Sequence, residues 1–63
     1  MQIILTDNET RALLQTLDER LRGLRHEIVH TSNHDYRNSL KEHERVLQCL
    51  HDKILTYHAI YAA

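Results

Sequence analysis

The second half of the chain carries an apolar repeat whose steps alternate between four and three residues. Its members are Tyr36, Leu40, His43, Leu47, Leu50, Ile54, Tyr57 and Tyr61. Steps of this size keep a row of side chains on one face of an α-helix, as in the seam of a coiled coil. Only His43 interrupts the apolar character of the row. The repeat therefore predicts a helix that presents one face to a partner helix.

A second row with the same period lies in the first half of the chain. Its members are Thr10, Leu14, Leu17, Leu21, Leu24 and Ile28. Just before it, Thr6 and Glu9 have the spacing of a capping box, in which each side chain bonds the backbone amide of the other residue. We therefore predict a first helix over about residues 7–30.

Three small polar residues, Thr31, Ser32 and Asn33, separate the two rows. Such side chains compete for backbone hydrogen bonds, which suits a turn or a helix N-cap better than a helix interior. We predict a turn over about 31–33, with Ser32 or Asn33 as the cap, and a second helix over about 34–60. One continuous helix is the alternative. Residues 1–63 are thus expected to form one all-α domain, a two-helix antiparallel hairpin.

In such a hairpin, facing residues have numbers that add to about 64. This register places Leu21 opposite His43. It also brings the apolar segment 3–5 beside an apolar end of the second helix, formed by Tyr57, Ile60 and Tyr61. The match between these two ends supports the hairpin over a continuous helix.

Two helices alone cannot enclose a core, and a chain of 63 residues buries only about 60% of its surface. A single cysteine, Cys49, excludes an internal disulfide and fits a reducing compartment. We therefore predict that two hairpins pack face to face as a homodimeric four-helix bundle. The predicted dimer core contains Leu14, Leu17, Leu21, Leu24, Ile28, Tyr36, Leu40, His43, Leu47, Leu50, Ile54 and Tyr57.

The run from His26 to His30 matches the HExxH pattern of zinc metalloproteases. In that chemistry two histidines one helical turn apart bind zinc, and the glutamate activates water. Here Ile28 belongs to the apolar row, so we expect His26 and His30 to point to solvent. We predict no catalytic residue and no cofactor. His26, His30 and His34 remain the candidates if the dimer binds a metal.

His43 is expected to be a buried histidine near the middle of the bundle, hydrogen-bonded to a neighbouring side chain or to water. The alternative is that His43 and its symmetry mate approach a two-fold axis and share a proton, a water molecule or a metal ion. Either role would make this histidine the one polar member of the predicted dimer core.

The charge pattern gives little support to binding of nucleic acid. Arg20, Arg22 and Arg25 are diluted by neighbouring acidic residues, and the formal net charge is −1. A solvated helix face is therefore favoured over a nucleic-acid patch. No stretch approaches the ~20 apolar residues of a membrane span, and the apolar segment 1–5 is too short for a signal peptide. We expect a cytoplasmic protein with no membrane partner.

The run from Leu24 to Thr31, followed by Tyr36-Arg37 and Leu40-Lys41, resembles a pattern in short bacterial helical-hairpin proteins of unknown function. The resemblance spans about residues 13–54 and implies a hairpin, but no functional residue. Helix lengths and turn position also resemble the repressor of primer, an RNA-binding hairpin dimer. We predict a non-catalytic homodimeric interaction or scaffold module that leaves room for a further protein partner. The alternatives are a repressor-of-primer-type regulator and a histidine-based metal-binding dimer.

Overall fold

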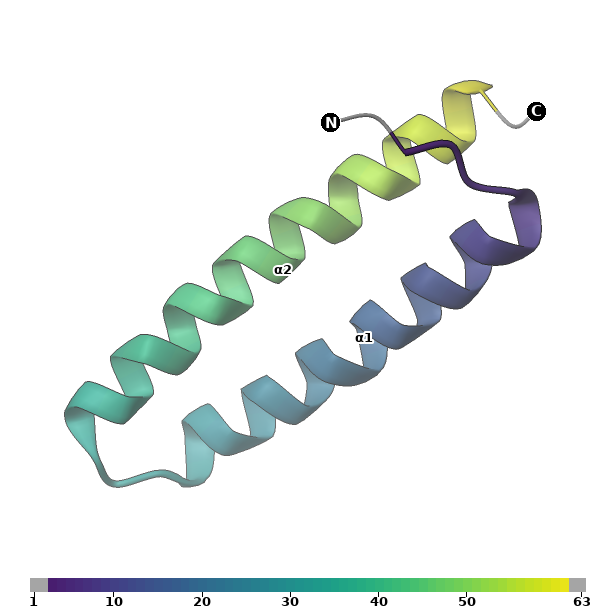
Figure 1. Ribbon diagram of the computed structural model, residues 1–63. Helices are drawn as coiled ribbons and strands as arrows, with labels where there is room; N and C mark the ends of the chain where they lie inside the picture. Colours follow the sequence, from purple (N-terminus) through teal and green to yellow (C-terminus); the bar gives the residue numbers. More distant parts are fainter. Residues whose placement is uncertain (1–2, 62–63) are drawn as a thin grey trace.

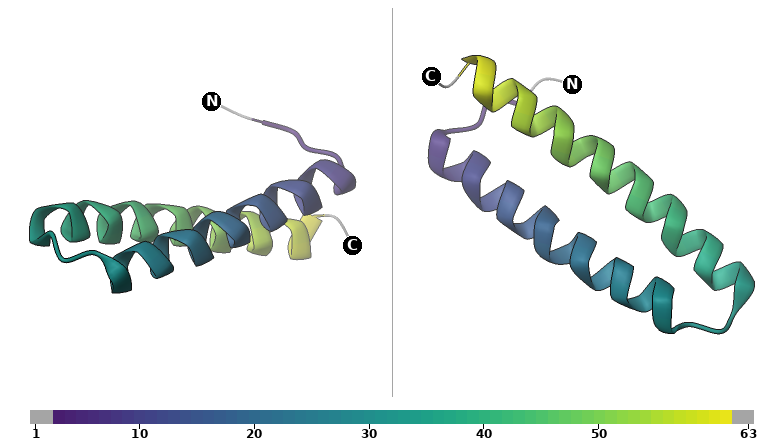
Figure 2. Two further views of the ribbon diagram at one scale, coloured as in Figure 1. Left: turned by 90° about the horizontal axis from the view of Figure 1, so that it is seen from below. Right: turned by 180° about the vertical axis from the view of Figure 1, so that it is seen from behind.

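The computed structural model describes residues 3–61, with side chains described as far as residue 57. Its two helices are α1, Asp7–His30, and α2, His34–Tyr61. They run antiparallel, with the start of α1 and the end of α2 at one end of the molecule and the turn at the other (Figure 1). Two further views show that the helices cross at a shallow angle (Figure 2). The all-α hairpin predicted from the sequence is therefore confirmed.

The capping box predicted at the start of α1 is present. The Glu9 amide donates to Thr6 Oγ1 over 3.1 Å, and the Thr6 amide donates to Glu9 Oε1 over 2.9 Å. The bond from the Thr6 backbone is the main reason that the pKa of Glu9 lies below its usual value. These two bonds satisfy amide groups that the first helical turn leaves unpaired, so α1 begins at Asp7.

The turn is held by backbone and side-chain hydrogen bonds at the two helix ends. The Thr31 amide donates to the Glu27 carbonyl over 2.9 Å as α1 ends. Asn33 Oδ1 accepts from the Tyr36 amide over 2.9 Å, so Asn33 is the N-cap of α2, as the sequence allowed. The Arg37 guanidinium donates to the Thr31 carbonyl and ties the first turn of α2 back to the end of α1.

The core between the helices is thin. Leu24 has no exposed surface, and Leu21 is only 2% exposed. Among the residues whose side chains are described, the buried apolar side chains are Leu17, Leu21, Leu24 and Leu40. A further set is half-buried along the helix–helix junction, namely Leu13, Leu14, Ile28, Leu47 and Ile54. This small core is typical of a short chain that gains stability from a further contact.

The apolar row predicted on α2 divides into two rows in the structure. Leu40, Leu47 and Ile54 lie against α1. The described members that alternate with them along the chain are exposed beside the junction, namely Tyr36, His43, Leu50 and Tyr57. His43, which the sequence places opposite Leu21, is exposed in the single hairpin, and its burial in a dimer core stays a prediction. His51, one helical turn from Leu47, takes the partly buried position beside α1.

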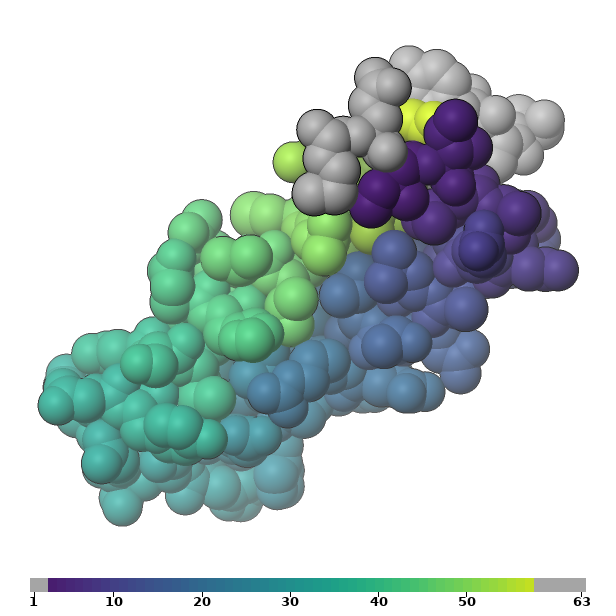
Figure 3. All heavy atoms as spheres, in the orientation of Figure 1, coloured from purple at the N-terminus to yellow at the C-terminus, as the bar shows by residue number. Residues whose placement is uncertain are grey.

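The segment before α1 lies against the end of α2. Ile3 and Leu5 line a pocket together with Leu50, Ile54 and Tyr57, and Figure 3 shows this segment lying across the end of the hairpin. Ile3 and Leu5 therefore lie around the same pocket as Tyr57, in agreement with the predicted place of this segment, whereas Ile4 is 91% exposed. The side chains of Ile60 and Tyr61, which the sequence placed in the same patch, fall outside the described residues.

Candidate interaction surface

The junction between the helices has two sides of different chemistry. A helix turns about 100° per residue, which puts Asp18 and Arg25 on one flank of the buried leucines of α1 and Leu13 and Glu27 on the other. We call the flank of Asp18 and Arg25 the polar side of the hairpin. The flank of Leu13 and Glu27 is its apolar side.

The polar side is closed by side-chain bonds between the helices. Arg25 Nε donates to Glu44 Oε2 over 2.9 Å, and Arg25 Nη2 donates to Gln48 Oε1 over 2.7 Å. The Gln48 side-chain Nε2 in turn donates to Asp52 Oδ1 over 3.0 Å. One arginine of α1 is therefore held by two successive turns of α2, a geometry that its forked guanidinium suits.

His51 extends this network toward the chain ends. Its Nε2 lies 3.0 Å from Asp18 Oδ1 on α1, and its Nδ1 lies 3.3 Å from Asp52 Oδ1 on α2. Both ring nitrogens can donate at once only when the imidazole is protonated, and a neutral ring bonds one carboxylate as a donor. The His51 side chain is 15% exposed, so it shields this side of the junction from water as well as bonding across it.

The apolar side carries an exposed row on α2. We call Tyr36, His43, Val46, Leu50 and Tyr57 the α2 stripe. Tyr36 is 50% exposed, Val46 50%, Leu50 40% and Tyr57 56%, and His43 is also exposed. Large apolar side chains left in water along one helix are typical of an interaction surface.

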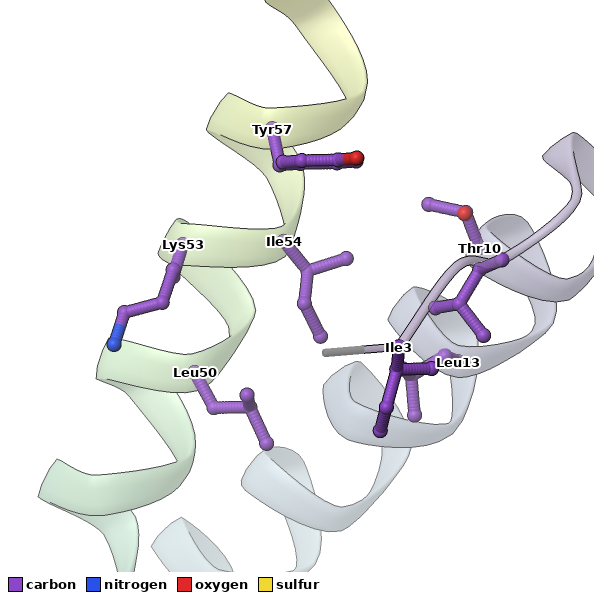
Figure 4. Close-up of a pocket in the computed structure, with 8 residues that line it drawn as sticks. Ile3, Thr10, Leu13, Leu50, Lys53, Ile54 and Tyr57 are labelled. Carbon is purple, nitrogen blue, oxygen red and sulfur yellow. The ribbon is translucent and has the colours of Figure 1, made fainter. Parts of the chain in front are cut away.

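A pocket of about 380 Å³ opens beside the stripe at the end of the hairpin. Figure 4 shows side chains that line it, coming from α1, α2 and the segment before α1. The apolar members are Ile3, Leu5, Leu13, Leu50, Ile54 and Tyr57. Of the other two, Thr10 already donates its hydroxyl to the Thr6 carbonyl over 3.0 Å, and Lys53 points its amine away from α1. The pocket is thus suited to an apolar or aromatic group.

At the opposite end of the apolar side, Tyr36 bonds to the other helix. Its hydroxyl donates to Glu27 Oε2 over 3.0 Å, and Arg20 Nη1 lies 3.7 Å from Glu27 Oε1. The hydrogen bond to the Glu27 carboxylate raises the pKa of the Tyr36 phenol above its usual value. The ring is therefore held in a fixed place while half of it remains in water.

The metal candidates do not come together as a site. His26 and His30 are exposed, as predicted, and their rings lie side by side at a tilt of 46°, with centroids 4.2 Å apart. His34 is exposed across the turn, and its Nε2 lies 3.4 Å from the side-chain Nδ2 of Asn38. Within the part of the chain that the structure describes, no three histidine, cysteine or acidic residues are arranged to hold a metal ion. Glu27 of the HExxH match is engaged by Arg20 and Tyr36 instead.

The arginine cluster is largely neutralised. Arg20 is paired with Glu27, and Arg25 with Glu44. Two of the three arginines of this cluster are thus paired with acidic side chains. Neither helix, over the residues described, is long and apolar enough to cross a membrane.

Comparison of the chain with family models, with curated proteins and with solved structures finds no significant match.

Proposed function

We propose that the chain is a non-catalytic helical interaction module that works as a homodimer, with two hairpins joined through their apolar sides into a four-helix bundle. The observation that carries the proposal is the α2 stripe. Four of its members are large apolar side chains that are 40–56% exposed in the single hairpin. Fully burying a side chain of this size contributes about 1.5–3 kcal/mol, so covering the stripe is a strong driving force for association.

The contrast with the rest of the molecule supports the same proposal. The polar side already satisfies its charges internally through Arg25 and His51. The core of the single hairpin is too small for a chain of this length to be expected to fold firmly alone. A second copy would enlarge that core without burying an unpaired carboxylate, ammonium or guanidinium group, because the stripe contains no Asp, Glu, Lys or Arg.

The test is the mass of the purified chain in solution. Light scattering at micromolar concentration should give twice the chain mass of 7.5 kDa. The melting temperature should also rise with concentration, because folding and association are linked. A chain that is monomeric, well folded and equally stable at every concentration would contradict the proposal.

A further inference from the structure

We propose that the two copies meet through their α2 helices in antiparallel orientation, about a two-fold axis beside Val46, so that Tyr36 of each copy packs at the pocket of the other. This inference rests on the proposed homodimer and goes beyond it by fixing the arrangement of the hairpins. It rests on three features of the apolar side: the spacing of the stripe, the place of the pocket and the charges on the outer flank.

The spacing of the α2 stripe is nearly the same in both directions. From Tyr36 the steps to His43, Val46, Leu50 and Tyr57 are seven, three, four and seven residues. A two-fold axis perpendicular to the helix reverses one copy, so it pairs residues whose numbers add to a constant. A sum of about 93 pairs Tyr36 with Tyr57 and His43 with Leu50, and it leaves Val46 at the axis. The stripe is therefore complementary to itself when one copy is reversed.

The place of the pocket agrees with this pairing. Tyr57 and Leu50 line it, and they are the residues that the pairing sets opposite the second copy's Tyr36 and His43. The apolar lining suits an aromatic ring, and the Tyr36 ring is 50% exposed although its hydroxyl bonds to Glu27 of its own chain. The pocket formed by the described residues is thus suited to receive this ring from the second copy.

The outer flank of the stripe supplies charge complementarity. Glu42 and Lys53 lie on the side of α2 that faces away from α1, as Figure 4 shows for Lys53. Glu42 also accepts hydrogen bonds from Arg45 of its own helix, over 2.6 and 3.2 Å, and keeps its exposed position beside the stripe. The antiparallel pairing brings Lys53 of one copy next to Glu42 of the other, and the two-fold axis makes this contact twice. A parallel alignment of the two α2 helices would instead put like charges together, which disfavours it.

Symmetric crosslinking tests the arrangement directly. In a Cys49→Ser background, Val46→Cys places one thiol of each copy beside the axis, where the approach suits a disulfide. Oxidised glutathione should crosslink this variant faster than a matched Leu55→Cys variant by about a hundredfold, because paired thiols have a millimolar effective concentration. Leu55 is 49% exposed on the same helix but lies off the stripe, so it controls for thiol exposure.

A mixture of two variants fixes the direction of the helices. Tyr36→Cys and Tyr57→Cys chains, both in the Cys49→Ser background, should combine after oxidation into the mixed 36–57 disulfide, which mass spectrometry separates from either self-pair. Self-pairing of Tyr36→Cys would mean that the turn ends meet. That result, or slow crosslinking of Val46→Cys in a chain that is still dimeric, overturns the antiparallel arrangement and leaves the proposed function standing. A monomeric Cys49→Ser chain overturns both.

Charge reversal gives a second readout that needs no thiol. Glu42→Lys should weaken the dimer by about fivefold, since it sets two lysines against each other at each end. Adding Lys53→Glu to the same chain should restore most of the lost affinity. If the double variant dimerises no better than Glu42→Lys alone, the two residues do not meet and the arrangement is overturned.

Discussion

The two sides of the helix–helix junction differ in how their side chains are satisfied. On the polar side, Arg25 and His51 bond across to the other helix and leave little to be gained from a partner. On the apolar side, Tyr36 bonds to Glu27 of α1, and Val46, Leu50 and Tyr57 of the α2 stripe remain 40–56% exposed in the described part of the chain. The polar side is therefore largely satisfied within the hairpin, whereas the apolar side keeps exposed apolar surface that a partner could bury. Association should therefore depend on the apolar side, and the polar side should matter mainly for the fold of the hairpin.

The largest change in the free energy of unfolding is expected from a substitution in the core between α1 and α2. Leu24→Ala removes a side chain with no exposed surface and should lower the free energy of unfolding by about 2–5 kcal/mol. Leu55→Ala on the exposed surface should change it by no more than about 0.5 kcal/mol. Urea unfolding followed by circular dichroism measures both. Equal losses for the two variants would mean that the packing between α1 and α2 is not as described.

The cap of α1 holds the segment that completes the pocket on the apolar side. Thr6→Ala removes one half of the capping box and should cost about 1 kcal/mol. The other half of the capping box is the bond from the Thr6 amide to the Glu9 carboxylate, and its contribution to stability depends on pH. Because the pKa of Glu9 is lowered in the folded chain, its contribution is present above the unfolded pKa and is lost as the pH falls through the folded pKa.

Thermal melts should detect this loss below the ordinary Glu range, where the wild type loses more stability on acidification than Glu9→Gln. Glu19→Gln, a change of another exposed glutamate of α1, is the matched control. If Glu9→Gln leaves the acid dependence as steep as Glu19→Gln does, the bond to Thr6 does not form in solution.

The polar side should yield a smaller and salt-sensitive effect. A double-mutant cycle on Arg25→Met and Glu44→Gln should give a coupling energy of about 0.2–1 kcal/mol, as exposed ion pairs do. The coupling should shrink in molar salt because the pair is screened. Neither variant should change the dissociation constant of the dimer, since both lie on the side away from the α2 stripe. If either variant weakens the dimer, the polar side also takes part in association, and the difference between the two sides is not as described.

The smallest effect concerns Tyr36 and is visible only in its titration. Its phenol should ionise above the ordinary tyrosine pKa of 10.0, because Glu27 accepts its hydrogen bond and opposes a second negative charge. A raised pKa means that the contribution to folding is present below the unfolded pKa and is lost as the pH rises through the folded one. Ultraviolet absorbance should show Glu27→Gln lowering the Tyr36 pKa. An unchanged titration would show that the ring is not anchored to α1.

Much of the fold follows from local signals in the sequence. The Thr6–Glu9 spacing and the run from Thr31 to Asn33 predict the start of α1 and the turn, because caps act through bonds to near neighbours. The face of α2 that packs against α1 could not be predicted from such local signals. Its apolar residues fill two adjacent rows, and a count of hydrophobic positions treats them as one seam.

Polar side chains also favour one of those rows. Asp18 and Arg25 of α1 bond His51, Gln48 and Glu44 in the arrangement in which Leu40 and Leu47 face α1 and His43 is exposed. A search for apolar seams passes over these residues. The signal that could have found them is the helical spacing of Glu44, Gln48 and His51 against residues of α1 able to bond them. The sequence therefore predicts the hairpin, whereas the position of its free apolar row depends on packing between helices.

The most direct test compares one charged residue at two places on the same helix. Leu50→Glu puts a carboxylate in the α2 stripe, and Leu55→Glu puts one off it, at similar exposures of 40% and 49%. Sedimentation equilibrium of both, with helix content checked by circular dichroism, should show Leu55→Glu as a dimer like the wild type and Leu50→Glu as a much weaker dimer or a monomer. If both variants dimerise equally well, or if Leu55→Glu is the one that dissociates, the α2 stripe is not the surface that joins two copies.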